Sequence, residues 1–179
     1  MKKLLVVVDY QTDFVTGALK NPAAAALEEA IADKVERHLA EDGAVIFTLD
    51  THPENYLETR EGRFLPAPHC IRGTDGWMLY GRLREYQDGV RDNVYFVEKP
   101  TFGAAALPGA ALAACGGEPA SIELCGVVTN ICVLSNAVLL HSHFLNCPIT
   151  VHGSLCAAAD EEAHKAALGL LAGLGIGVG

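Results

Sequence analysis

The sequence predicts a three-layer α/β fold of the Rossmann-like type, in which a mostly parallel sheet of about five to six strands carries helices on both faces. Apolar runs of strand length alternate along the chain with segments of helical periodicity, and this order is typical of parallel sheets. The chain of 179 residues is long enough for one domain with a substantial core. Because no linker or internal repeat interrupts it, we expect a single domain across residues 1–179.

Each predicted element has a local signal. Residues 4–8 are apolar throughout, as expected for a strand that is buried on both faces. Asn21 and Pro22 indicate a helix start, and an apolar stripe with four-residue spacing continues to Gly43. Further strands are predicted at 44–49, 94–97, 121–125, 149–151 and 176–178, and helices at 77–83, 104–114, 133–144 and 160–171. The Pro- and Gly-containing segment 50–74 is expected to be irregular.

Charge and cysteine content narrow the possible partners and location. A net charge of −9 argues against nucleic acid or an anionic membrane as the main partner, since both require clustered Lys and Arg. No stretch is long enough to span a bilayer, and Asp9 ends the first apolar run too early for a signal peptide. We therefore expect a cytoplasmic protein whose six cysteines are free thiols.

Polar side chains with chemical potential follow several predicted strands. Asp9 follows the first strand and Asp50 the second. Lys99 follows the third, and Cys132 lies shortly after the fourth. Because ligand sites of parallel α/β sheets lie at the carboxyl ends of the strands, we expect these side chains to share one site.

Cys132 is the candidate nucleophile of that site. It lies where a strand is expected to turn into a helix, so its thiol would face the positive end of a helix dipole and backbone N–H groups. Such surroundings favour a thiolate and can bind an oxyanion. Asp9 can carry the proton that a thiol nucleophile exchanges, and Lys99 can stabilise the Asp9 carboxylate. Together, Asp9, Lys99 and Cys132 form a predicted hydrolytic triad.

A second group of residues has the composition of a metal site. Asp50 and His52 are two positions apart, and His69 lies further along the same irregular segment. Imidazole combined with carboxylate suits Zn²⁺, Mn²⁺ or Fe²⁺. The sequence therefore favours a divalent metal at the end of the second strand.

Five motifs occur in order along nearly the whole chain: DYQTDF (9–14), DTHP (50–53), HCIRGT (69–74), KPTFG (99–103) and GVVTNICV (126–133). Together they resemble the isochorismatase-like cysteine hydrolases, most closely the nicotinamidase-related proteins. The resemblance implies that Asp9 is the general base and acid, Lys99 the orienting cation and Cys132 the nucleophile. It also implies a cis peptide between Val127 and Val128, and an oxyanion hole formed by the amides of Val128 and Cys132.

The resemblance extends to the predicted metal site. In metal-binding nicotinamidases an acidic residue often joins the group that corresponds to Asp50, His52 and His69. Glu61 is the first candidate for that residue and Glu58 the second. A metal held there could anchor a pyridine nitrogen or polarise the ring.

Two positions depart from the family pattern. Thr51 stands where pyridine-specific relatives commonly carry an aromatic residue, and Asn130 stands where Asp is usual. Phe14 and Trp77 are the candidate aromatic residues of the substrate pocket. Since family members commonly form dimers or tetramers, the resemblance also implies a homo-oligomer.

Hydrolysis of a small amide is the leading functional hypothesis, with nicotinamide converted to nicotinate and ammonia through a thioester. Another small amide or an N-carbamoyl compound is the alternative substrate, and a non-catalytic small-molecule-binding protein with the same fold is the alternative function. An aspartyl-phosphate phosphohydrolase is disfavoured because Gln11 stands where a second acid is required. A dinucleotide-binding protein is disfavoured because no glycine-rich turn follows the first strand.

Overall fold

The computed structural model describes residues 1–179 and contains one sheet of six strands in the order β3-β2-β1-β4-β5-β6. Every neighbouring pair of strands is parallel. The strands are β1 (Lys3–Val8), β2 (Ala44–Asp50), β3 (Val94–Lys99), β4 (Ser121–Val127), β5 (Ile149–Ala157) and β6 (Gly177–Val178). The predicted α/β fold is confirmed, and the first and last strands belong to the same sheet.

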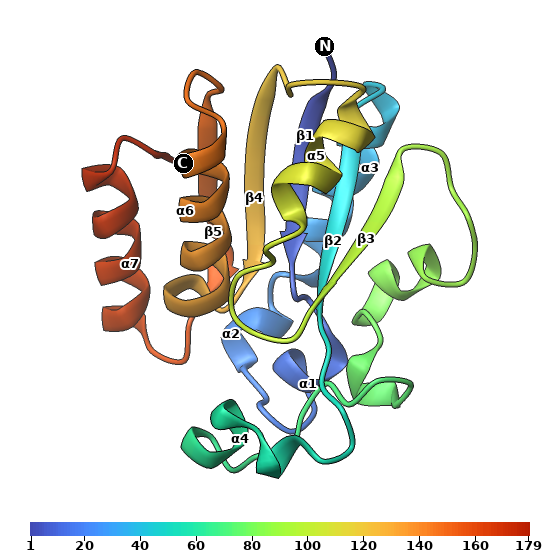
Figure 1. Cartoon of the computed structure of the whole chain (residues 1–179), viewed down its shortest axis with the longest axis vertical. Coiled ribbons are helices and arrows are strands. Elements are labelled where there is room, and N and C mark those ends of the chain that lie inside the picture. Colours follow the sequence, from blue (N-terminus) through green and yellow to red (C-terminus); the bar gives the residue numbers. More distant parts are fainter.

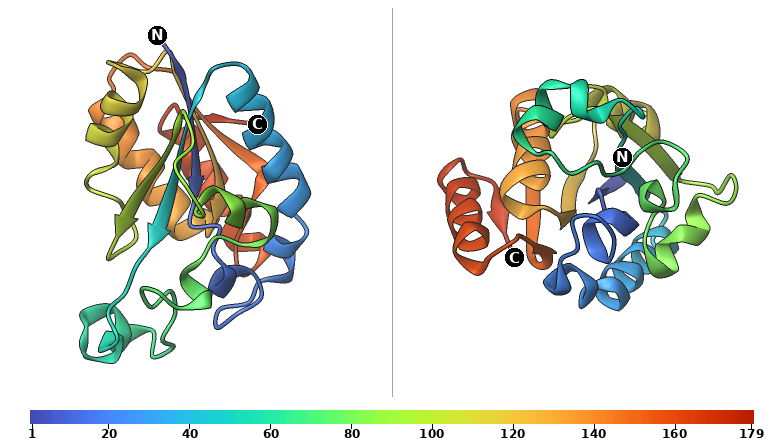
Figure 2. Two further views of the ribbon diagram at one scale, coloured as in Figure 1. Left: turned by 90° about the vertical axis from the view of Figure 1, so that its right-hand side faces the viewer. Right: turned by 90° about the horizontal axis from the view of Figure 1, so that it is seen from below.

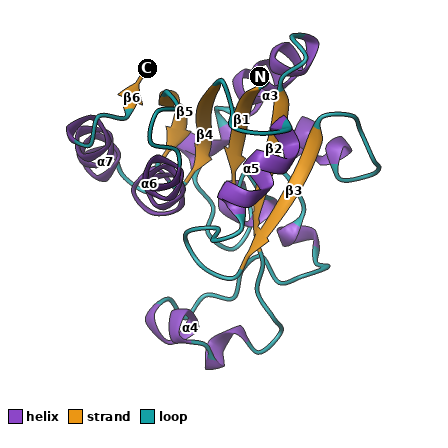
Figure 3. Cartoon of the chain, turned by 45° about the horizontal axis from the view of Figure 1, so that its top comes forward, coloured by secondary structure: helices purple, strands orange, loops and turns teal.

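Helices cover both faces of this sheet (Figure 1). One face carries α1 (Thr12–Val15), α2 (Pro22–Ala25) and α3 (Glu28–Ala40), and the other carries α5 (Leu107–Cys115), α6 (Leu134–His143) and α7 (Glu161–Gly173) (Figure 2). The short helix α4 (Arg60–Phe64) lies beyond the carboxyl ends of the strands (Figure 3). None of the helices has both the length and the apolar character needed to cross a membrane.

The strand order explains where the site lies. Alternate side chains of β1 enter different cores, so Val6 packs with α5 and α6 while Val7 packs with α3. The chain first builds outward from β1 to β2 and β3, and then returns to place β4 on the other side of β1. In such a sheet a crevice opens at the carboxyl ends of the two strands where the order reverses. Here these strands are β1 and β4.

Two predicted helices differ from the structure. The single helix expected after Asn21 is divided into α2 and α3, and the Asn21 side chain caps α2 by accepting hydrogen bonds from the next two free amides. The helix predicted at 77–83 is wrong. Two 3₁₀ helices, η2 (Asp75–Trp77) and η3 (Gly81–Tyr86), flank an extended stretch in which Leu79 pairs with Gln11. This pairing with a distant segment overrides the local helical pattern.

Other boundaries differ by a few residues. The irregular segment after β2 contains the 3₁₀ helix η1 (Tyr56–Glu58) as well as α4. Strand β5 continues to Ala157, well beyond the predicted end at residue 151. All six cysteines are free, as expected.

Candidate active site

Side chains from four strand ends meet around the ammonium group of Lys99. Its Nζ atom lies 2.6 Å from Asp9 Oδ2 and 3.1 Å from Asp50 Oδ1. It also lies 3.5 Å from Cys132 Sγ. Asp9 is 0% exposed, Lys99 1% and Cys132 4%, so the charges interact with little screening by water. Lys99 therefore contacts both of the other predicted triad residues.

Burial dominates the electrostatics of these groups. It raises the pKa of the Cys132 thiol well above its usual value, and the Asp9 carboxylate raises it further against the opposing charge of Lys99. Burial also raises the pKa of Asp9, although Lys99 opposes the shift. For Lys99, burial lowers the pKa, but the charges of Asp9, Cys132 and Asp50 outweigh it and the net shift is upward. Burial and Asp9 thus oppose ionisation of the Cys132 thiol, whereas the adjacent Lys99 ammonium group favours it.

Asp9 is held by Thr48 of the neighbouring strand β2. The Thr48 hydroxyl donates to Asp9 Oδ1 at 2.6 Å, and the Asp9 amide donates to the Thr48 carbonyl at 3.2 Å. The other carboxylate oxygen, Oδ2, belongs to the ion pair with Lys99 and accepts no hydrogen bond. One oxygen is therefore fixed, while the other can take a proton. No sequence motif pointed to Thr48, because its partner is 39 positions away.

The turn that carries Cys132 differs from the expected first turn of a helix. The peptide bond between Val127 and Val128 is cis. It is followed by a π-helical turn, η4 (Thr129–Val133), before α6 begins. Gly126, with φ +116°, lets β4 approach β1 closely, because a Cβ there would overlap the Val8 backbone. The chain can thus bend sharply at the strand end, and Cys132 sits inside the π-helical turn.

Asn136, also missed by the sequence analysis, ties this turn to the loop after β3. Its Nδ2 group donates to the Cys132 carbonyl at 2.9 Å and to the Phe102 carbonyl at 3.3 Å. Its Oδ1 atom accepts from the Ala104 amide at 2.8 Å. The four-residue spacing from Cys132 placed Asn136 one helical turn away and was the available signal.

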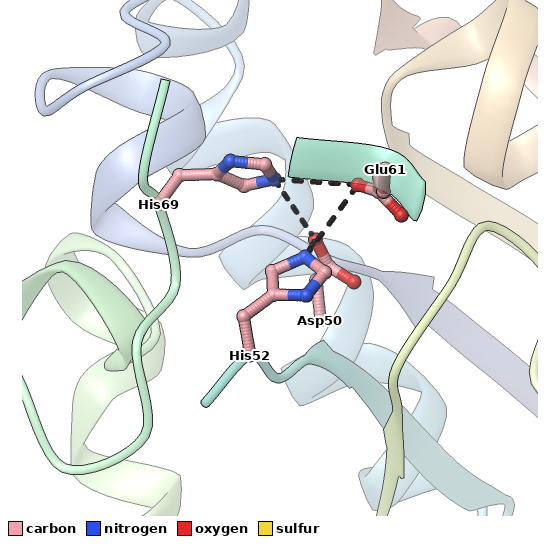
Figure 4. Close-up of side chains that lie close together, drawn as sticks. All are labelled: Asp50, His52, Glu61 and His69. Atoms are coloured by element: carbon pink, nitrogen blue, oxygen red, sulfur yellow. Dashed lines mark hydrogen bonds and ion pairs between the residues drawn. The ribbon is translucent and has the colours of Figure 1, made fainter. Parts of the chain in front are cut away.

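The predicted metal ligands form a compact group beside the triad (Figure 4). Asp50 Oδ2 lies 3.0 Å from His52 Nε2 and 3.3 Å from His69 Nε2. Glu61 Oε1, from α4, lies 3.6 Å and 3.8 Å from the same two nitrogens. One ligand atom from each of the four residues lies within 4.8 Å of the others. Glu58 is exposed and accepts a hydrogen bond from Asn55, so Glu61 is the acidic residue that completes the group.

The chemistry of this group fits a divalent cation. Two imidazole nitrogens and two carboxylates suit Zn²⁺, Mn²⁺ or Fe²⁺. His69 Nδ1 lies 2.8 Å from the Ala67 carbonyl, and this contact directs Nε2 toward the group. Burial and the nearby Asp50 carboxylate raise the pKa of Glu61, which indicates crowded negative charge that a cation would neutralise. Asp50 also links the two sites, because its other oxygen contacts Lys99.

A cavity of about 480 Å³ brings the two groups to one surface. Cys132, Asp50, Glu61 and His69 all line it. Its apolar lining includes Phe14, Leu19, Leu65, Phe102, Val128 and Ile131. The volume is in the usual range of small-molecule sites.

The aromatic residues of the cavity are partly those expected. Phe14 lines it and packs edge-on against the His69 ring, with 5.5 Å between ring centroids. Trp77 does not line the cavity, so its predicted place in the substrate pocket is wrong. Its indole N–H donates to the Thr51 hydroxyl at 2.8 Å, and its side chain packs against the core beneath α3. Phe102, 40% exposed, is the aromatic residue that was missed, although it belongs to the KPTFG motif.

The parallel sheet and the buried acid, cation and thiol beside a cavity define the class of this protein as an α/β enzyme with a hydrolytic type of site. Comparison with known proteins supports this assignment to a class. The model of the isochorismatase domain family matches residues 3–178. The uncharacterized isochorismatase family protein PncA of Bacillus subtilis is 34% identical over 173 residues, which cover 94% of this chain and 93% of that protein.

Solved structures give the same result. Nicotinamidase/pyrazinamidase PncA from Bacillus subtilis has a TM-score of 0.87 at 31% identity, with 99% of both chains covered. The pyrazinamidase/nicotinamidase from Streptococcus mutans UA159 has a TM-score of 0.86 at 32% identity, again with 99% of both chains covered. The chain belongs to the isochorismatase family and, within it, to the nicotinamidase-related amidohydrolases.

Proposed function

We propose that this protein hydrolyses a small amide to a carboxylic acid and ammonia, and that nicotinamide is its substrate. The contacts of Lys99 with Asp9 and with Cys132, which lines the cavity, are the observation that carries the proposal. The substrate is supported by whole-length similarity above 30% identity to proteins named nicotinamidases.

In the proposed reaction, Asp9 takes the thiol proton of Cys132 as the sulfur attacks the amide carbonyl carbon. The N–H groups of Val128 and Cys132 stabilise the resulting oxyanion. Asp9 then donates its proton to the amide nitrogen, and the C–N bond breaks. Ammonia departs, and the acyl group stays bound to Cys132 as a thioester. Asp9 next deprotonates a water molecule, which attacks the thioester, and the proton returns to the Cys132 sulfur as the acid departs. Lys99 holds Asp9 and Cys132 in place through both steps.

The second group belongs to the same proposal. Asp50, His52, Glu61 and His69 would hold one divalent metal ion, Zn²⁺, Mn²⁺ or Fe²⁺. When bound, the ion supplies a Lewis acid for an electron-pair donor of the substrate, such as a pyridine nitrogen. Phe14 and Phe102 provide aromatic surface along the cavity and would contact a flat ring. We also propose that the protein forms a homo-oligomer and lies in the cytoplasm.

Ammonia release from a panel of amides tests the function. We expect the highest kcat/KM for nicotinamide, compared with pyrazinamide, benzamide and N-carbamoylglycine, and loss of activity after treatment with iodoacetamide. A higher kcat/KM for N-carbamoylglycine would replace nicotinamide by the alternative substrate class. If no amide releases ammonia while calorimetry detects nicotinamide binding, the protein is a binding protein and the proposed reaction is wrong.

Metal content provides a separate prediction. We expect about one divalent ion per chain in the purified wild-type protein, measured by inductively coupled plasma mass spectrometry. His69→Ala removes a ligand and is expected to weaken binding by at least about 100-fold, so the ion is lost on dialysis. Glu58→Gln is the matched control, because Glu58 lies on the same segment outside the group, and it should retain the ion. Equal retention in both variants would show that the metal assignment is mistaken.

A further inference from the structure

We propose that Asn136 is a positioning residue that sets the nucleophile turn against the loop that follows Lys99 and contains Phe102. Where it concerns turnover, this inference rests on the proposed amidase function. Asn136 contacts neither the Cys132 sulfur nor the Lys99 ammonium group, so it would act through the backbone segments that hold them.

All hydrogen bonds of the Asn136 side chain go to backbone groups of these two segments. It donates to the carbonyls of Cys132 and Phe102 and accepts from the Ala104 amide, over distances of 2.9, 3.3 and 2.8 Å. The residue is 0% exposed. Asparagine is a poor helix former, so helical propensity does not account for its place in α6. An apolar residue of similar size would leave two carbonyls and one N–H group without these partners.

The loop that Asn136 holds has little regular structure of its own. Residues 100–106 connect β3 to α5 without a helix or strand. Gly103 packs directly on α6, since a Cβ there would lie 2.8 Å from Leu139 Cδ1 and 3.5 Å from Ser135 Cβ. Asn136, between Ser135 and Leu139 in sequence, therefore fastens the loop to α6 beside this contact.

This attachment matters because the turn carries Cys132 and the loop directly follows Lys99. The Lys99 Nζ atom lies 3.5 Å from Cys132 Sγ, and the two residues belong to different segments that meet at the site. A displacement of about 1 Å at a reacting group can lower the rate about 100-fold. Without Asn136, the loop and the turn would lose a shared support on which the Lys99–Cys132 distance depends.

The test combines Asn136→Ala with two other variants. Gly103→Ala crowds the same loop against the Leu139 and Ser135 side chains of α6 while Asn136 is kept. Leu140→Ala, one turn further along α6 and also 0% exposed, lowers stability while it leaves every hydrogen bond of Asn136 in place, and so is the matched control. For Asn136→Ala and Gly103→Ala we expect kcat to fall about 100-fold with KM within about threefold. Leu140→Ala should lower the melting temperature at least as much while kcat is unchanged at 25 °C.

The rate at which iodoacetamide alkylates Cys132, followed at one pH by peptide mass spectrometry, needs no substrate. It should fall about tenfold in Asn136→Ala and Gly103→Ala, because Lys99 no longer stabilises the thiolate optimally. If both variants match Leu140→Ala in kcat and alkylation rate, Asn136 is merely structural and the inference fails. If the wild type hydrolyses no amide, alkylation still decides the role of Asn136. If Asn136→Ala does not fold, Gly103→Ala decides it.

Discussion

Replacing Cys132 with alanine is expected to abolish amide hydrolysis, with a fall in kcat of about 10⁴-fold or more. The sulfur is the atom that would bond to the substrate carbonyl, and alanine offers no group to replace it. The fold should survive, because the side chain is small and the change removes one sulfur atom from a position beside an open cavity. Ammonia release measures the loss. Mass spectrometry of the quenched reaction should show an acyl adduct in the wild type and none in the variant.

Cys147→Ala is the control for this prediction. Cys147 lies before β5 and donates to the Pro119 carbonyl at 3.3 Å, at the amino ends of the strands and far from the triad. Its removal should leave kcat within about twofold of the wild type. Retention of more than a tenth of wild-type activity in Cys132→Ala would rule out the thioester pathway.

Asp9→Asn is expected to lower kcat by about 10²- to 10⁴-fold, because an amide group keeps the shape of the carboxylate but cannot carry the proton. The change also leaves Lys99 with one buried carboxylate partner, Asp50, where it had two. We therefore expect a lower melting temperature as well, since loss of one member of a buried ion pair is destabilising. Metal content should be unchanged, because the four metal-group residues remain. Wild-type kcat in Asp9→Asn would show that another group transfers the proton.

Thr48→Val gives an independent test of the same carboxylate. The Thr48 hydroxyl donates to Asp9 Oδ1 and lowers the pKa of Asp9, which burial otherwise raises. Valine has the same shape without the donor, so the pKa of Asp9 should rise. Because Asp9 acts as a base only when ionised, the acid limb of kcat/KM should move to higher pH by roughly 1–2 units. An acid limb that stays in place, or that moves to lower pH, would show that this limb does not report the ionisation of Asp9.

The fold was predictable because its main signals are local. An apolar run such as Leu4–Val8 can be buried on both faces only in a central parallel strand, and alternation with helical segments specifies a parallel sheet. In a parallel sheet all carboxyl ends meet at one edge. Because Asp9, Lys99 and Cys132 each follow a predicted strand, their proximity could be predicted from the sequence.

The failed predictions share a different cause. Trp77 and Phe102 are both exposed enough to line a cavity, but Trp77 pairs with Thr51 from a distant segment and turns away from it. The helix predicted at 77–83 is replaced because Leu79 pairs with Gln11. In each case the deciding partner lies far away in the sequence, so local pattern could not reveal it.

The sequence by itself determined which chemical groups follow the successive strands. These are an acid, a second acid, a cation and a thiol, each at the end of a parallel strand. Only the tertiary structure decided that Glu61 rather than Glu58 joins the metal group and that Thr48 and Asn136 support the triad. It also decided how deeply Cys132 is buried, which raises the pKa of its thiol. Hydrogen bonds and the desolvation of charge depend on which segments the folded chain brings together, and burial around Cys132 outweighs the local features that favour a thiolate.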